Sequence, residues 1–184
     1  MIEKLRKYVN LDRLGSYIPL PADAITAISL LAALLGVFFT WRGVPAWIFI
    51  ALVGVLDVLD GAVARARGTA GRSGALLDST LDRYTDALIL LYFYGEAPPL
   101  LIYSSLIGTF LISYVRARAE SLGLSMRGVG FMERGERVIY LFLASLIGQY
   151  AFRPALVWAL YIYAVLVNAA AAYRFLAAYS ALRR

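Results

Sequence analysis

Residues 57–82 read DVLDGAVARARGTAGRSGALLDSTLD, and this stretch decides the fold because a long apolar run lies on each side of it. It contains the four aspartates Asp57, Asp60, Asp78 and Asp82 together with three arginines. Charged side chains are costly in or beside a bilayer, so they are rare there and are usually functional. The stretch therefore predicts a functional site at the facing ends of two membrane helices.

The composition of the whole chain is that of a membrane protein. Hydrophobic residues make up 61% of the 184 residues, whereas soluble domains contain about 45–50%. Six apolar runs occur, and most approach the ~20 residues that a helix needs to cross about 30 Å of hydrocarbon. The runs are Ala22–Trp41, Ala46–Ala64, Gly74–Tyr94, Pro98–Tyr114, Val138–Phe152 and Pro154–Tyr173. Because strand-type alternation is absent, we expect an all-α membrane protein with six transmembrane helices in a single domain, residues 1–184.

The N-terminal residues and the distribution of basic residues predict the topology. In residues 1–16, Ile2, Leu5 and Val9 fall near one helical face, which predicts a juxtamembrane, interfacial amphipathic helix. Lysines and arginines gather at the chain ends and in two connections, and such clusters mark the cytoplasmic side. Both termini are therefore expected to be cytoplasmic. Membrane-edge arginines also account for the net charge of +6, so no nucleic-acid partner is inferred.

The spacing of the aspartates predicts that their carboxylates converge. Asp57 and Asp60 are three residues apart, and Asp78 and Asp82 are four apart, so each pair shares a helical face. The short, glycine-rich connection between the pairs makes the two helices antiparallel neighbours. The chain has no cysteine and no histidine, which leaves oxygen ligands for a hard cation such as Mg²⁺, Mn²⁺ or Ca²⁺. Four carboxylates suit two divalent ions, an arrangement that stabilises both attacking and leaving oxygens at phosphorus.

A structural interpretation of the same aspartates stays open at this point. They could instead form ion pairs with the neighbouring arginines Arg65, Arg67, Arg72 and Arg83. The regular spacing on two adjacent helices favours the metal site. Gly61 follows Asp60 directly, and a helical glycine leaves room for a ligand or for another backbone. Arg65 lies one turn further, where its guanidinium suits a diphosphate.

The spacing Asp57-x2-Asp60-Gly61-x2-Ala64-Arg65-x8-Gly74-x3-Asp78-x3-Asp82 resembles the signature of the CDP-alcohol phosphotransferase family. The resemblance implies a transferase of phospholipid biosynthesis that moves a phosphatidyl-type group from a CDP-lipid to an alcohol and releases CMP. It implies two Mg²⁺ ions, with Mn²⁺ as a possible substitute, held by the four aspartates, and it makes Asp82 the general base as well. It also implies a homodimer with its active site at the cytoplasmic face of the cell membrane. The residues expected to bind the nucleotide are Asp23, Thr26, Gly61, Arg65, Gly71 and Gly74.

The alcohol acceptor is predicted from a second basic cluster. Arg116, Arg137 and Arg174 resemble phosphate ligands of the phosphatidylinositol-phosphate and archaetidylinositol-phosphate synthase branch, which implies inositol phosphate as the acceptor and diacyl or archaeal diether lipid as the donor. Glycerol 3-phosphate is the alternative acceptor, since it also carries a phosphate. Arg174 lies alone in an apolar run, so snorkelling towards lipid headgroups is a second interpretation of this residue. Outside enzymes, intramembrane aspartates would suit a cation or proton transporter.

Overall fold

The computed structural model describes residues 15–69 and 71–183, and all regular secondary structure in these ranges is helical. The all-α prediction is therefore confirmed for the described part of the chain. The expected amphipathic helix over residues 1–16 lies outside the described residues, apart from Gly15 and Ser16, which are helical. The chain forms two compact units, residues 1–89 and 90–184.

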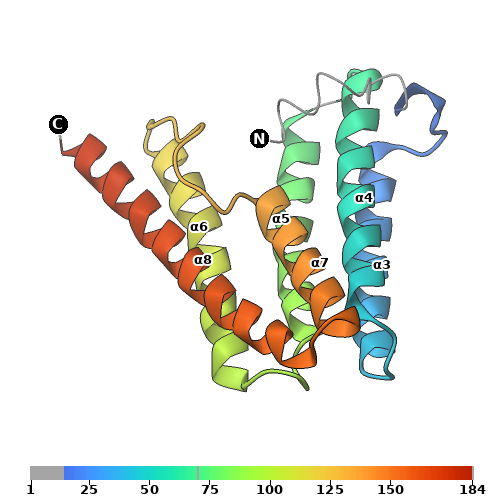
Figure 1. Ribbon diagram of the computed structural model, residues 1–184. Helices are drawn as coiled ribbons and strands as arrows, with labels where there is room; N and C mark the ends of the chain where they lie inside the picture. Colours follow the sequence, from blue (N-terminus) through green and yellow to red (C-terminus); the bar gives the residue numbers. More distant parts are fainter. Residues whose placement is uncertain (1–14, 70, 184) are drawn as a thin grey trace. The chain divides into compact units, whose positions relative to one another are not determined.

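The first unit contains α3 (Ala22–Thr40), α4 (Ala46–Ala66) and all but the last two residues of α5 (Arg72–Leu91), shown in Figure 1. Helix α3 packs against α4, with Ala33 of α3 and Ile50 and Val53 of α4 completely buried. The segment before α3 is bound to the end of α4, because the Arg67 guanidinium donates a hydrogen bond to the carbonyl of Ile18. Gly68 follows α4 with a positive φ of 64°, a conformation that ends helices and favours glycine.

The second unit contains α6 (Pro99–Ser121), α7 (Arg134–Tyr150) and α8 (Arg153–Leu182). Helix α8 packs against both α6 and α7. Helix α6 begins with a proline in its first turn, where the missing N–H costs nothing. Helix α7 begins with a capping box, in which the side chains of Glu133 and Glu136 accept hydrogen bonds from each other's backbone.

Polar side chains and glycines hold the helices of the second unit together. The hydroxyls of Thr109 and Tyr163 are 3.1 Å apart, and the side-chain amide of Asn168 donates to the carbonyl of Ser104 at 3.0 Å. Such contacts join helices where apolar burial gives no net drive to association, as in lipid. Gly108 of α6 lies directly against the backbone of α8: a Cβ added to it would be 2.7 Å from a methyl of Val167 and 2.9 Å from the Asn168 nitrogen.

We expect Gly108→Val to destabilise the second unit by about 1–3 kcal/mol, because the added side chain forces α6 away from α8. The change is measured as a fall in the midpoint of thermal unfolding in detergent. Gly95→Ala is the matched control, since a Cβ added at Gly95 meets nothing within 4 Å. Equal midpoints for the two variants would contradict the close contact of these helices.

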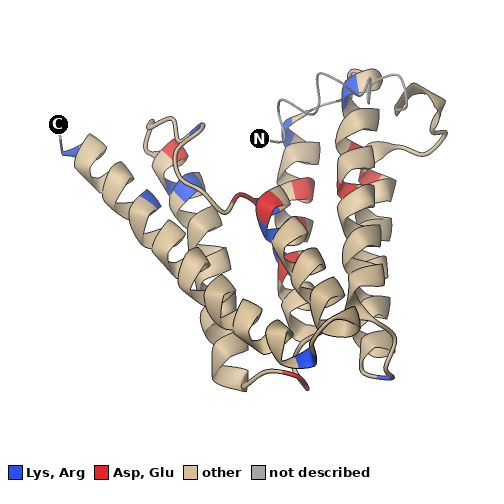
Figure 2. Ribbon diagram, in the orientation of Figure 1, with Lys and Arg blue, Asp and Glu red and all other residues tan. Residues whose placement is uncertain are grey.

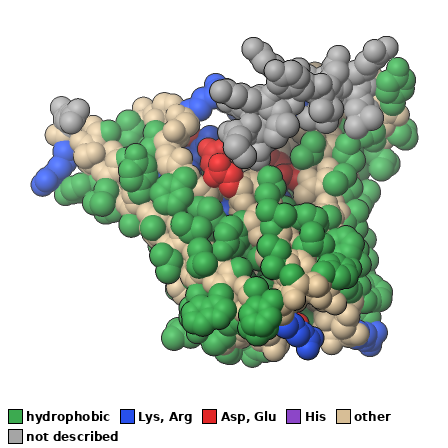
Figure 3. All heavy atoms as spheres, in the orientation of Figure 1, with side chains coloured by type: hydrophobic (Ala, Val, Ile, Leu, Met, Phe, Trp, Pro, Cys, Tyr) green, Lys and Arg blue, Asp and Glu red, His purple; other side chains and the backbone are tan. Residues whose placement is uncertain are grey.

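Four helices in the described part of the chain, α3, α4, α6 and α8, are long and apolar enough to cross a membrane. Much of their exposed surface is apolar, and Leu31, Leu34 and Phe38 of α3 are each about half exposed. Green hydrophobic side chains accordingly cover much of the visible surface in Figure 3. Helix α5 is also long but carries aspartates and arginines, and α7 has 17 residues. The chain is thus a helical membrane protein, and six spans stay a prediction.

Candidate functional site

Three of the predicted carboxylates meet between α4 and α5. Asp57 and Asp60 come from the C-terminal half of α4 and Asp78 comes from the first half of α5, and one oxygen atom of each lies within 4.8 Å of the others. Figure 2 marks the positions of acidic residues in red on the ribbon of these helices. Carboxylates this close repel one another unless they are protonated or neutralised. The group consists of oxygen ligands alone and is therefore suited to a hard divalent cation.

Asp60 is the most constrained member of this group. Its side chain is buried, with 6% exposure, and its Oδ2 accepts a hydrogen bond of 2.9 Å from the Thr26 hydroxyl of α3. Thr26 is buried as well. A hydrogen bond that orients a metal-binding carboxylate is typical of metal centres, since it fixes the ligand before the ion arrives. Thr26 therefore links α3 to the carboxylate group.

A cavity of about 220 Å³ opens beside the carboxylates. All six residues predicted to bind the nucleotide line it, and so do Asp60 and Asp78. The nucleotide-binding predictions are Asp23, Thr26, Gly61, Arg65, Gly71 and Gly74. The structure thus brings together residues from three helices and the glycine-rich connection, which the sequence spreads over more than fifty positions.

Glycines keep this cavity open. A Cβ added to Gly61 would lie 3.1 Å from Arg65 Nη1, and one added to Gly74 would lie 3.5 Å from Asp23 Oδ1. The cavity also has a lining residue that the sequence did not indicate as functional, Thr69. The signal that could have identified Thr69 is its place in a glycine-rich connection after an arginine, because such loops commonly hold phosphates.

Asp82 lies outside the group of three. Its Oδ2 is 3.5 Å from Nη1 of Arg83, and its side chain is 13% exposed. The ion-pair interpretation of the aspartates thus applies to this residue. It lies one turn beyond Asp78 on α5, so both side chains share a helical face. The role of Asp82 as a metal ligand and general base stays a prediction.

The basic cluster predicted to bind the acceptor is found in the second unit. The side chains of Arg137 and Arg174 are buried, with 2% and 3% exposure. Arg137 Nη1 donates to the carbonyl of Met132 at 2.9 Å, and Arg174 Nη1 donates to the carbonyl of Ile112 at 3.2 Å. Arg174 is therefore held inside the protein and does not extend towards headgroups. Burying a cation costs several kcal/mol unless it is compensated, and buried arginines of this kind are candidates for a functional role.

Arg116 differs from the two buried arginines. Its side chain is 43% exposed, and its Nε donates to Glu120 Oε1 at 3.1 Å along the same helix. An exposed pair of this kind contributes little to stability. A phosphate could therefore replace Glu120 as the partner of Arg116 at a small cost in free energy.

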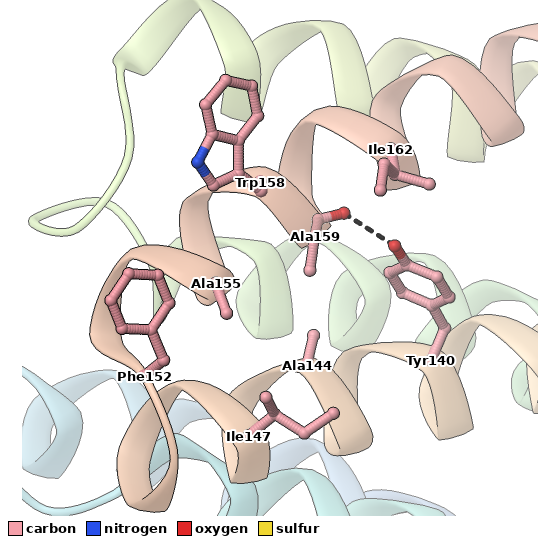
Figure 4. A pocket seen from close by; sticks show the side chains of 8 residues that line it. All are labelled: Tyr140, Ala144, Ile147, Phe152, Ala155, Trp158, Ala159 and Ile162. Atoms are coloured by element: carbon pink, nitrogen blue, oxygen red, sulfur yellow. Dashed lines mark hydrogen bonds between the residues drawn. The ribbon is translucent and has the colours of Figure 1, made fainter.

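Two further hollows among the described residues are lined mainly by apolar side chains. One of about 350 Å³ lies between α7 and α8 and is lined by alanines, Ile147, Phe152 and Trp158, as Figure 4 shows. The Tyr140 hydroxyl lines it too, but it donates to the Ala159 carbonyl at 2.8 Å. Another of about 430 Å³ lies between α6 and α8. Neither is lined by an acidic or basic side chain, whereas the carboxylate cavity is lined by both kinds.

Comparison with known proteins agrees with these features. Residues 20–172 match the family model described as CDP-alcohol phosphatidyltransferase. The archaetidylinositol phosphate synthase of Pyrococcus horikoshii is 39% identical over 158 residues, which cover 79% of this chain and 82% of the relative. The phosphatidylinositol phosphate synthase of Mycobacteroides abscessus is 40% identical over 133 residues, covering 66% and 58%.

Solved structures of phosphatidylinositol phosphate synthase also resemble this chain. The crystal structure of Mycobacterium tuberculosis phosphatidylinositol phosphate synthase (PgsA1) with CDP-DAG bound has a TM-score of 0.78 and 29% identity, and the match covers 93% of this chain and 92% of that one. The structure of the same protein in complex with manganese and citrate has a TM-score of 0.78 and 28% identity, over 93% and 88%. The chain belongs to the CDP-alcohol phosphatidyltransferase family, and it is an enzyme of that family.

Proposed function

We propose that this protein transfers a phosphatidyl-type group, diacyl or archaeal diether, from a CDP-lipid to a hydroxyl of inositol phosphate and releases CMP. The observation that carries the choice of acceptor is the pair of buried arginines, Arg137 and Arg174. A bound phosphate would offset the free-energy cost of burying the two guanidinium groups, since guanidinium–phosphate hydrogen bonds are charge-assisted and bidentate. Relatives named archaetidylinositol phosphate and phosphatidylinositol phosphate synthase support the same choice.

The donor is assigned to the carboxylate cavity. Arg65, Gly61 and the glycine-rich connection would hold the diphosphate, and Asp23 and Thr26 would lie beside the nucleotide. The residues proposed to hold two Mg²⁺ ions, or Mn²⁺ in their place, are Asp57, Asp60, Asp78 and Asp82. When bound, such ions neutralise charge on the phosphoryl oxygens. The structural neighbour in complex with manganese supports the use of a divalent ion.

Asp82 is the proposed general base. Its carboxylate takes the proton from the acceptor hydroxyl, and the freed oxygen forms a bond with the phosphorus that carries the lipid. The bond between this phosphorus and the oxygen bridging to CMP breaks, and CMP leaves. Arg65 would bind the negative charge that develops on the leaving phosphate.

The topology proposed with this function is six transmembrane helices with both termini in the cytoplasm, acting as one domain of residues 1–184. Helix α5 would be the most polar span because its aspartates serve the active site. An active site at the cytoplasmic face of the cell membrane lets the lipid donor enter from the bilayer and the polar acceptor enter from water. We propose a homodimer, the association implied by the family resemblance.

A transfer assay tests the acceptor. Membranes that contain the protein are supplied with Mg²⁺, with diacyl or diether CDP-lipid, and with labelled inositol phosphate, glycerol 3-phosphate or free inositol in turn. We expect lipid product and CMP from inositol phosphate. The reaction with free inositol should be at least about 100-fold slower, because free inositol has no phosphate for the arginines to bind. Membranes without the protein give the background. Product from glycerol 3-phosphate and none from inositol phosphate would make glycerol 3-phosphate the acceptor.

A further inference from the structure

The loop between α6 and α7 contacts both buried arginines. It spans residues 122–133, and within it Gly128, Gly130 and Met132 have positive φ values of 75°, 97° and 57°. Met132 is the only residue other than glycine with a positive φ in the described part of the chain. Left-handed backbone is rare for a side chain of this kind and costs of order 1 kcal/mol or more. Such strain persists where surrounding contacts fix it, and Arg137 makes such a contact with the Met132 carbonyl.

The left-handed conformation of Met132 directs its carbonyl at Arg137. The carbonyl oxygen accepts the hydrogen bond of 2.9 Å from Arg137 Nη1, and both side chains are buried, with 7% exposure for Met132 and 2% for Arg137. A change of backbone conformation at residue 132 rotates this carbonyl away. The guanidinium of Arg137 would then lose this hydrogen bond, which helps to set its orientation.

Gly130 packs against the guanidinium of Arg174. A Cβ added to Gly130 would lie 3.1 Å from Nε, 3.2 Å from Nη2 and 3.6 Å from Cζ. The added atom would thus press on the edge of the guanidinium that holds Nε and Nη2. The Arg174 Nε has no hydrogen-bond partner within the described ranges, so the packing of Gly130 against this edge affects where the guanidinium lies. Any side chain at position 130 has to displace either the loop or the guanidinium.

We propose that Gly130 and Met132 are positioning residues for the acceptor phosphate: their backbone sets the orientation of Arg174 and Arg137. The inference rests on the proposed function, because it takes the two arginines as phosphate ligands. The loop then contributes to acceptor specificity through backbone geometry alone. The KM for a phosphorylated acceptor depends on the loop, and the KM for the CDP-lipid does not.

Met132→Val and Met132→Gly separate this role from simple packing. Valine retains more of the buried side chain but resists a positive φ, whereas glycine removes the side chain and adopts that φ freely. We expect Met132→Val to raise the KM for inositol phosphate about 10- to 100-fold, the usual effect of losing a charge-assisted hydrogen bond, and Met132→Gly to raise it less. Packing alone predicts the reverse order, and that order would overturn the proposal.

Gly130→Ala and Gly128→Ala form the second pair. Both place alanine at a positive φ in the same loop, but a Cβ at Gly128 meets nothing within 4 Å. We expect Gly130→Ala to raise the KM for inositol phosphate about 10-fold or more, while Gly128→Ala leaves it within about twofold. The KM for CDP-lipid should stay within about twofold in both, which also shows that each variant is folded. Equal effects of the two alanines on the acceptor would overturn the role of Gly130.

The assay also distinguishes failure of this inference from failure of the proposed acceptor. If the wild-type enzyme uses glycerol 3-phosphate, the proposed acceptor is wrong, and the same four variants are compared with that phosphate ester. The order of the KM values for glycerol 3-phosphate among these variants then tests the role of the loop. If the wild-type enzyme turns over only an acceptor without phosphate, both the proposed function and this inference are overturned.

Discussion

Asp60→Asn should lower the rate of CMP release by about 100- to 1,000-fold at millimolar Mg²⁺, the scale on which loss of one electrostatic stabiliser acts. Asp60 is the buried member of the three-carboxylate group and is held by Thr26. The amide has the same shape as the carboxylate but carries no charge, so the group loses affinity for a divalent cation. We therefore expect weaker Mn²⁺ binding together with the lower rate.

Two measurements check this result. Mn²⁺ titration of the purified protein, followed by electron paramagnetic resonance, reports metal affinity, and CMP release at increasing Mg²⁺ reports whether more ion restores the rate. Glu96→Gln makes the same chemical change at a partly exposed carboxylate that lies 4.0 Å from Arg153 and does not line the carboxylate cavity. It should behave as the wild-type protein does. Wild-type metal affinity in Asp60→Asn would show that the metal is bound elsewhere.

Asp82→Asn should lower kcat by about 10²- to 10⁴-fold, the usual contribution of a general base. Because the three carboxylates that meet are Asp57, Asp60 and Asp78, we expect this variant to retain most of its Mn²⁺ affinity. It thus differs from Asp60→Asn, in which metal binding and turnover fall together. Thermal unfolding in detergent shows whether the variant is folded.

The outcomes for Asp82 are distinct. Normal turnover would refute its assignment as the base. Loss of Mn²⁺ affinity equal to that of Asp60→Asn would instead make Asp82 a metal ligand, as the resemblance implied, with the carboxylate moving from the position in which it lies 3.5 Å from Arg83.

The helices themselves could be predicted closely because hydrophobic runs and their ends are local features. The run Gly74–Tyr94 corresponds to α5 at Arg72–Leu91, and Ala46–Ala64 corresponds to α4 at Ala46–Ala66. The length of the last helix was underestimated, since the predicted run ended at Tyr173. Arg174 interrupts the apolar run, but arginine is a good helix former, and α8 continues to Leu182 with this arginine buried against the Ile112 carbonyl.

The sequence by itself determined which residues share a helical face, since this depends only on the period of the helix. That was enough to predict the carboxylate pairs, whereas the six cavity residues from Asp23 to Gly74 and the arginines Arg116, Arg137 and Arg174 were expected from the family resemblance. Only the tertiary structure decided which side chains meet, because distances between helices depend on packing over the whole chain. It placed Asp82 beside Arg83 and outside the group of three. It also placed Gly130 and Met132 against Arg174 and Arg137, contacts that arise from backbone conformation and leave no pattern in the sequence.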